Sequence, residues 1–230
     1  MKRFWEIDLL RGVSLVFMVA FNYSVALKYF GVFYMGDGWA FEWLFPRIIA
    51  SLFILLAGIS LWLSWSRAPS ARRIALRGAR IFAYGMAVTL VTWIFFPAYM
   101  ITFGILHLIG VSIMLSIPFL ARRKMLPLAL LFILMGAYLG MQNLQFSPAF
   151  WLVPQIFQTF DYFPLLPWFG VFLLGVFIGS NLYDSAKRRY GIREAPSAAK
   201  PFMLLGRRSL FIYLIHQPVL LALLYFTGFI

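Results

Sequence analysis

Long apolar runs alternate with short polar stretches along the whole chain. The runs cover about residues 9–30, 43–65, 80–97, 103–121, 125–142, 164–183 and 208–229. Their lengths are close to the ~20 residues that a helix needs to cross the hydrocarbon core of a bilayer. The pattern predicts an all-α fold: a polytopic integral membrane bundle of about seven transmembrane helices, with residues 1–230 forming a single domain.

Composition supports this class of protein. Hydrophobic residues make up 63% of the 230 positions and charged residues only 12%, whereas a soluble domain has about 45–50% apolar and about 25% charged residues. The net charge of +13 would suit a nucleic-acid partner. The basic residues instead form short clusters between apolar runs, as they do in the cytoplasmic loops of membrane proteins. We therefore expect a lipid bilayer, and no nucleic acid, as a partner.

The distribution of basic residues also predicts the orientation. If the N-terminus is cytoplasmic and the chain crosses seven times, every lysine and arginine lies on the inner side except Lys28 and Arg47. Short cytoplasmic loops carry such an excess. We expect a multi-pass protein of the plasma membrane whose C-terminus faces outside.

Four connections complete the predicted organisation. The basic stretch 70–80, SARRIALRGAR, is interpreted as an amphipathic connection that attracts anionic lipid or holds a phosphorylated cofactor. RRK at 122–124 predicts a tight hairpin between the fourth and fifth spans. The aromatic segment 143–163 predicts an interfacial or re-entrant segment. The polar, proline-containing stretch 184–206 predicts a mobile linker.

The first span carries polar residues that are costly in lipid. Asp8 and Arg11 lie three residues apart on one helix face and can form an ion pair. Asn22 follows Asp8 by nearly four helical turns and falls towards the same side. Ionisable groups in a span usually face a protein interior or an aqueous cavity. The stripe predicts a lined cavity; the alternatives are a pair that only sets orientation and an amide that bonds a neighbouring helix.

Two histidines are the sharper signal for chemistry. His107 stands near the outer end of the fourth span, and His216 stands in the seventh, followed by Gln217 and Pro218. Histidine can act as a general base near neutral pH. For either residue alone, an interhelical hydrogen bond is the ordinary alternative. His107 is the stronger candidate because it lies nearer an aqueous face. The two histidines are far apart in sequence and no cysteine is present, so no metal site is predicted.

Two further residues stand near the predicted outer side. Arg47 is interpreted either as a snorkelling side chain or as a clamp for an anionic or carbonyl-bearing group. Asp37, Glu42 and Asp161 are its candidate partners. Trp168 can form an aromatic wall, although tryptophan is common at a membrane interface.

Five stretches together resemble a known family. They are EIDLLRGVSLVFMVAFN, SLFILLAGISLWLS, FGILHLIGVSIML, LPWFGVFLLGVFIG and LGRRSLFIYLIHQPVLL, and they cover nearly the whole chain in order. The chain resembles the transmembrane acyltransferase superfamily, and most of all prokaryotic relatives of the catalytic domain of heparan-α-glucosaminide N-acetyltransferase. The resemblance implies an enzyme that moves an acetyl or other acyl group from cytoplasmic acyl-CoA to a sugar or glycolipid acceptor.

The resemblance also implies roles for the candidate residues. The inner bases would meet the phosphates of acetyl-CoA or another acyl-CoA, and the polar stripe would line the path of the pantetheine arm. The predicted catalytic residues are His107 and Asp8. The predicted cofactor-binding residues are Arg72, Arg73 and Arg77, and the predicted substrate-binding residues are Arg11, Asn22, Arg47, Trp168, His216 and Gln217.

The chain departs from the family pattern in three ways. Many relatives carry histidine at the position of Asn22. The lysosomal branch has an active-site histidine in its first outer loop, whereas the corresponding loop of this chain contains none. This chain also has fewer spans than the lysosomal enzyme. Direct transfer with a histidine base, an acyl-histidine intermediate and loss of activity all stay open. A small transporter or flippase and an inactive membrane scaffold are the competing functions. Homo-oligomerisation through Gly170, Gly175 and Gly179 is a further alternative to their packing within one chain.

Overall fold

A computed structural model describes residues 4–29, 31–32, 38–121, 125–142, 152, 159–184, 187–191 and 194–228. The described chain is almost entirely helical, as predicted, with one short hairpin of two-residue strands. It divides into two compact units, Met1–Phe53 with Ile192–Ile230 and Ile54–Gly191.

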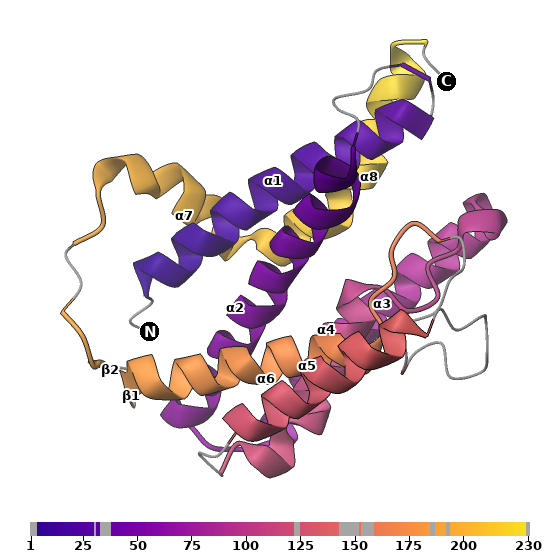
Figure 1. The fold of residues 1–230 in the computed structure, drawn as a ribbon. Coiled ribbons are helices and arrows are strands. Elements are labelled where there is room, and N and C mark those ends of the chain that lie inside the picture. Colours follow the sequence, from indigo (N-terminus) through magenta and orange to yellow (C-terminus); the bar gives the residue numbers. More distant parts are fainter. Residues whose placement is uncertain are drawn as a thin grey trace. The chain divides into compact units, whose positions relative to one another are not determined.

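The first unit is built from both ends of the chain. Helix α1 packs against α7 and, less extensively, α8 (Figure 1). Its elements are α1 (Trp5–Tyr29), a π-helical segment (Ala40–Leu44), the first turns of α2 (Phe45–Arg67), a 3-10 turn (Ser197–Ala199), α7 (Lys200–Arg207) and α8 (Ser209–Phe226).

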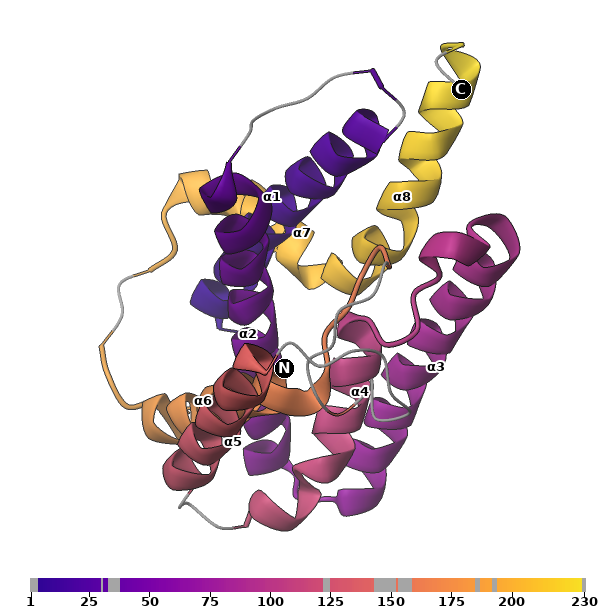
Figure 2. The same ribbon diagram turned by 45° about the vertical axis from the view of Figure 1, so that its right-hand side comes forward.

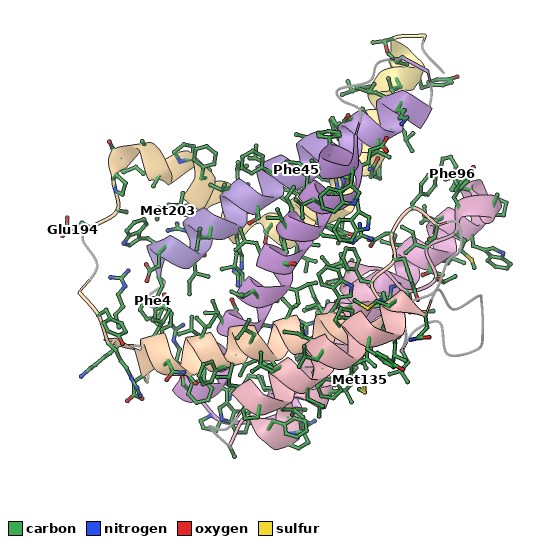
Figure 3. All side chains as sticks on the ribbon, viewed as in Figure 1. Phe4, Phe45, Phe96, Met135, Glu194 and Met203 are labelled. Atoms are coloured by element: carbon green, nitrogen blue, oxygen red, sulfur yellow. The ribbon has the colours of Figure 1, made fainter. Side chains whose placement is uncertain are left out.

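Close backbone contact holds α7 on α1. A Cβ atom on Gly12 would collide with the backbone of Phe202, and one on Gly206 would collide with the carbonyl oxygen of Asp8. Small residues at such crossings let helix backbones approach in membrane bundles. Gly12 of the RG motif and Gly206 of the LGRR motif therefore meet in the fold, although they are far apart in sequence. Figure 3 labels Phe4, just before α1, and Met203 of α7.

The second unit contains two antiparallel helix pairs, α3 with α4 and α5 with α6 (Figure 2). The C-terminal part of α2 packs on α6: a Cβ atom on Gly175 would collide with the carbonyl oxygen of Leu55. The elements are the rest of α2, α3 (Ala71–Phe95), a 3-10 turn (Pro97–Tyr99), α4 (Ile105–Leu115), a second 3-10 turn (Ile117–Phe119), α5 (Leu126–Met141), α6 (Leu165–Leu182), β1 (Tyr183–Asp184) and β2 (Lys187–Arg188).

The glycines of α6 pack helices within the chain. Gly170 lies against Ala129 and Ile133 of α5, whereas Gly175 and Gly179 lie against α2. Of the two alternatives raised for this stripe, packing within one chain is the one that the structure shows.

Five helices are long and apolar enough to cross a membrane, within the residues that the structure describes. They are Trp5–Lys28, Ala40–Arg67, Ala71–Phe95, Leu165–Leu182 and Ser209–Phe226. Helices α4 and α5 are apolar but shorter, with 11 and 16 residues. The protein is therefore an all-α membrane protein.

Two predicted boundaries are wrong. Helix α3 begins at Ala71, not at residue 80, because Ser70 caps its N-terminus and accepts a hydrogen bond from the Arg73 amide. The basic stretch is thus the start of a long helix and not a separate connection. Helix α4 ends at Leu115, short of the predicted 121, because a 3-10 turn containing Pro118 follows it.

The predicted linker 184–206 is also partly wrong, because its last residues form α7 on α1. The tight hairpin at RRK and most of the segment 143–163 lie outside the described residues. Helix α4 takes α3 as its main neighbour, and α5 takes α6.

Candidate active site

One polar contact in the first unit joins two residues from opposite ends of the chain. Asn22 of α1 and His216 of α8 meet with 3.1 Å between Nδ2 of the amide and Nε2 of the ring. His216 is only 6% exposed. The other ring nitrogen, Nδ1, lies 2.7 Å from the carbonyl oxygen of Tyr213, one turn earlier on α8. Both nitrogens of this histidine therefore have a polar partner within the helix pair.

The chemistry of the partners assigns the proton on the His216 ring. A carbonyl oxygen can only accept, so Nδ1 carries the hydrogen that bonds to Tyr213. The Asn22 NH₂ group can only donate, so Nε2 is the unprotonated acceptor. With the amide nitrogen of Asn22 facing the ring, the imidazole is neutral and its lone pair points at that amide. If Nε2 gains a proton, rotating the Asn22 amide by half a turn presents its oxygen as an acceptor.

Tyr23, the residue after Asn22, holds α8 at the same level. Its hydroxyl donates to the carbonyl oxygen of His216 at 3.0 Å, and its ring lies nearly parallel to the imidazole. Pro218, two residues after His216, lacks a backbone N–H and leaves a carbonyl of the preceding turn of α8 without its helical donor. Gln217, between His216 and Pro218, is half-buried. Tyr23 thus fixes the backbone of α8 beside a break in its hydrogen-bond ladder.

Asp8 has an ion pair that sequence spacing does not reveal. Its buried Oδ2 lies 3.3 Å from Nε of Arg207 at the end of α7. Arg207 is itself exposed, so one side of the pair meets solvent or headgroups. The contact is made beside the Gly12 and Gly206 crossing. Asp8 therefore joins α7 to α1, and Arg11 lies half-buried one turn further along α1.

His107 lies in the second unit and is 1% exposed. Its Nδ1 accepts from the backbone N–H of Gly104 at 3.2 Å. Its Nε2 lies 3.3 Å from the hydroxyl of Thr89, which donates its own hydrogen to the carbonyl oxygen of Ile101 at 2.6 Å. Since the threonine hydrogen is used, Nε2–H is the donor to Thr89. The ring connects α3, α4 and the turn between them.

The surroundings of His107 leave little room for a second partner. Phe103 stacks on the ring with centroids 5.6 Å apart, and Phe82 meets it edge-on at 5.3 Å. A Cβ atom on Gly85 would lie 3.0 Å from the imidazole. The bond from Gly104 supplies an acceptor to one of the N–H groups that the start of α4 leaves unpaired. The imidazole here caps a helix.

A carboxylate shares this helix start with His107. Oδ2 of Asp161 accepts from the backbone N–H of Ile105 at 2.9 Å, which suits a negative charge at the positive end of a helix. The residues around it pair with the turn before α4, and Phe163 N–H donates to the carbonyl oxygen of Phe103 at 2.9 Å. Asp161 is therefore a second cap of α4. It was predicted as a candidate partner of Arg47.

The predicted cofactor-binding arginines lie at the start of α3. Arg72 and Arg73 are exposed in its first turn, and Arg77 is half-buried one turn later. Unpaired N–H groups at a helix start also attract anions. Arginine is the residue type that binds phosphate oxygens with two parallel hydrogen bonds, and three arginines stand in the first two turns of this helix.

Two other predicted substrate-binding residues are held by aromatic neighbours. The Arg47 guanidinium lies 4.2 Å above the ring of Trp43 and donates to the Trp43 carbonyl oxygen at 2.8 Å. Trp168, in the first turn of α6, meets Phe163 edge-on with centroids 5.0 Å apart. Glu42, another candidate partner of Arg47, instead bonds Lys28 at 2.8 Å.

Nearly the whole chain matches a known protein family. The sequence model of the family described as "Heparan-alpha-glucosaminide N-acetyltransferase, catalytic" matches residues 3–218. The chain belongs to this family. The match extends from the start of α1 to Pro218 in α8, so it includes Asp8, Asn22, His107 and His216. No curated protein and no solved structure matches the chain.

Membership of this N-acetyltransferase family makes the protein a member of a membrane acyltransferase family. Within the described segments, no three histidine, cysteine or acidic residues lie together in a way that could hold a metal ion.

Sequence reasoning missed four of the residues that organise these clusters. Tyr23 and Thr89 are ordinary span residues in the sequence, and Arg207 was counted only as an inner base. Asp161 lies 56 residues from the amide it caps. The LGRR motif was a signal for the region of Arg207, but no spacing rule connects it with Asp8.

Proposed function

We propose that the protein transfers an acetyl or other acyl group from cytoplasmic acyl-CoA to an acceptor at or across the plasma membrane. The acceptor is a sugar or glycolipid with a free hydroxyl or amine. Membership of the N-acetyltransferase family supports the reaction class. The observation that carries the proposal is the Asn22–His216 contact, because it places a neutral imidazole with an assigned lone pair between two membrane helices.

The proposed topology has seven spans with a cytoplasmic N-terminus. Five helices meet the length and hydropathy of a span, and the other two spans are proposed around α4, which the turn Ile117–Phe119 extends, and around α5. An odd number of crossings puts the C-terminus outside. The exposed Arg67, Arg72 and Arg73 then lie at the inner ends of α2 and α3, in keeping with the positive-inside rule.

The start of α3, in the second unit, is proposed to bind the acyl donor. Acyl-CoA supplies an acyl group activated as a thioester. The side chains of Arg72, Arg73 and Arg77 hold its phosphates, helped by the N–H groups at the helix start. Because these contacts are charge-assisted and partly exposed, they weaken as salt is added.

The residues of the first unit are proposed to handle the proton. His216 takes the proton of the acceptor hydroxyl or amine on Nε2, once that group replaces the Asn22 amide as its partner. The acceptor oxygen or nitrogen then bonds to the acyl carbon, and the thiol leaves with a proton from the imidazole. The NH₂ group of Asn22 is then available to donate to the developing oxyanion. Tyr23 and the Asp8–Arg207 pair keep α8, α7 and α1 in register.

His107 remains a predicted base, and its geometry is less favourable. Its lone pair is bonded to a backbone N–H that cannot rotate away. A proton on Nδ1 would face the Gly104 N–H group and would add positive charge at the positive end of α4. Arg11, Arg47, Trp168 and Gln217 stay predicted contacts of the substrate.

Binding of acetyl-CoA to the purified, folded protein in detergent tests the proposal, with coenzyme A alone as the comparison. We expect saturable binding by calorimetry, and thiol release that depends on an added acceptor. Charge reversal of Arg72, Arg73 and Arg77 together should weaken binding, while the exposed Arg208 offers a matched control. No binding at millimolar ligand, together with movement of a lipid or sugar across vesicles without coenzyme A, would establish a transporter instead.

Release of thiol without any acceptor bears on the route. A burst that matches the amount of enzyme indicates an acyl-histidine intermediate. Release that begins only when the acceptor is added indicates direct transfer.

A further inference from the structure

The segment that leads into α2 carries aromatic residues on two opposite faces. On one face Phe41 and Phe45 stack with ring centroids 5.8 Å apart, and both contact Phe21 of α1, at 5.6 and 6.0 Å. Phe45 is labelled in Figure 3. Phe17 meets Phe45 edge-on at 6.0 Å. This face supplies the contact between the π-helical segment and α1.

The other face is an exposed ladder of planar groups, Trp39, Trp43 and Arg47. The two indoles stack with centroids 4.9 Å apart and an interplanar angle of 17°. The Arg47 guanidinium lies 4.2 Å above Trp43 and is fixed by its bond to the Trp43 carbonyl oxygen. Trp39 is 64% exposed and Trp43 45%. Because the phenylalanine face already packs this segment on α1, the ladder is not needed for that contact.

The charge on the ladder is not compensated within the described residues. Lys28 and Arg47 are the two bases predicted on the outer side, and Lys28 forms an ion pair with Glu42 at 2.8 Å. Arg47 has no carboxylate partner among the residues that the structure describes. One Arg47 donor is used on its own helix, and the other N–H groups of the fork remain for a ligand.

Helix length places the ladder at the level of the lipid headgroups. The apolar helix Ala40–Arg67 has 28 residues. At 1.5 Å per residue it is about 42 Å long, close to the ~40–45 Å of a bilayer with its headgroup regions. If this helix is centred on the ~30 Å hydrocarbon core, about 6 Å at each end, or one turn, lies outside the core. Trp39 and Trp43 then lie in the headgroup region, where tryptophan is enriched, and the Arg47 side chain reaches back towards that region through its bond to the Trp43 carbonyl oxygen. The abundant anions at this depth are lipid phosphates.

We propose that Trp39, Trp43 and Arg47 form a binding site for the headgroup of an anionic glycerophospholipid. The free N–H groups of Arg47 bond the phosphate, and the stacked indoles lie against the glycerol backbone and the first carbons of the acyl chains. A guanidinium held over an indole keeps its orientation, so less freedom is lost on binding. The proposal gives Arg47 a lipid phosphate as its ligand in place of the predicted acyl-transfer substrate, and it does not require the protein to be an enzyme.

The test is native mass spectrometry of the full chain in detergent, titrated with phosphatidylglycerol or with phosphatidylcholine of the same acyl chains. Wild-type protein should retain phosphatidylglycerol in preference to phosphatidylcholine. Arg47→Gln and Trp43→Ala should each weaken retention about tenfold, the effect of losing a charge-assisted hydrogen bond or its support. Arg47→Lys should be intermediate, because a lysine keeps the charge but not the planar stack.

Matched controls separate the ladder from general surface effects. Trp93 of α3 is an equally exposed tryptophan (60%), and Arg208 is an exposed arginine outside the basic stretch 70–80. Trp93→Ala and Arg208→Gln should retain the lipid as wild type does. Thermal unfolding of each variant checks that the fold is intact.

Three outcomes would overturn the proposal. One is equal retention of the two lipids by wild-type protein, and another is unchanged retention by folded Arg47→Gln and Trp43→Ala. The third is a loss in these variants of binding to a soluble sugar with lipid retention intact, which would assign the ladder to the acceptor. None of the readouts uses acyl transfer, so failure of the transferase proposal leaves the result interpretable.

Discussion

The two histidines of the chain are both buried and both hydrogen-bonded, but their partners differ in kind. His107 receives its bond from a backbone N–H at the start of its own helix. His216 receives its bond from the Asn22 side chain on another helix. A backbone amide is fixed by its helix, whereas a carboxamide can rotate about its last torsion and exchange donor for acceptor. Burial therefore does not distinguish the two histidines, whereas the freedom of the hydrogen-bond partner does, and this difference is the reason for proposing His216 as the base.

Removal of the His216 imidazole is expected to have the largest effect. His216→Ala should lower acyl transfer about 10²–10⁴-fold, the usual contribution of a general base. Its thermal stability should change much less than its activity. The measurement is thiol release from acetyl-CoA with and without acceptor, and the control is unchanged binding of acetyl-CoA. If His216→Ala turns over at the wild-type rate, His216 is not the general base and His107 becomes the stronger candidate.

Loss of the Asn22 amide should come next. Asn22→Ala leaves the imidazole intact but removes both its partner and a candidate oxyanion donor, so transfer should fall roughly 10–100-fold. Asn22→Gln, which keeps the amide on a longer stem, is the matched variant and should retain part of the activity. Equal activities for the wild type and Asn22→Ala would mean that the contact only holds α1 to α8.

Substitution of His107 should affect stability more than chemistry. His107→Ala leaves the buried Gly104 N–H without its acceptor, which costs about 1–3 kcal/mol of unfolding free energy, while the Thr89 hydroxyl keeps its bond to the Ile101 carbonyl oxygen. His107→Asn supplies a shorter acceptor and should restore part of it. The measurement is thermal or denaturant unfolding beside turnover per folded molecule. If His107→Ala abolishes turnover with its stability and acetyl-CoA binding intact, the sequence-based prediction holds.

The Asp8–Arg207 pair should show the smallest effect. Asp8→Asn, Arg207→Gln and the double variant form a cycle whose coupling energy should be about 1 kcal/mol, because Arg207 is exposed. Arg208→Gln, at the exposed neighbouring position, is the control and should couple with nothing. A coupling near zero would mean that the glycine crossing alone keeps α7 on α1. A large loss of turnover without loss of stability would support the predicted catalytic role of Asp8.

Much of the secondary structure follows from the sequence. The predicted spans 125–142 and 164–183 agree with α5 and α6 to within one residue at each end. The error at α3 arose because arginines in SARRIALRGAR were read as a connection, although arginine is a good helix former and Ser70 is a typical cap. The helix propensity of arginine and the Ser70 cap were sufficient to predict the start of α3. A search for apolar runs does not detect a helix that begins with basic residues.

The membrane class, the family and the candidate residues for chemistry can be read from the amino-acid sequence. They depend on apolar run length, on the placement of charge and on motifs along the chain. The contacts of Asn22 with His216 and of Arg207 with Asp8, and the cap that His107 forms on α4, are known from the folded chain alone. Every apolar span gains similarly from lipid, so hydropathy does not say which helices pair. Small-residue crossings and side-chain hydrogen bonds between distant segments make that choice.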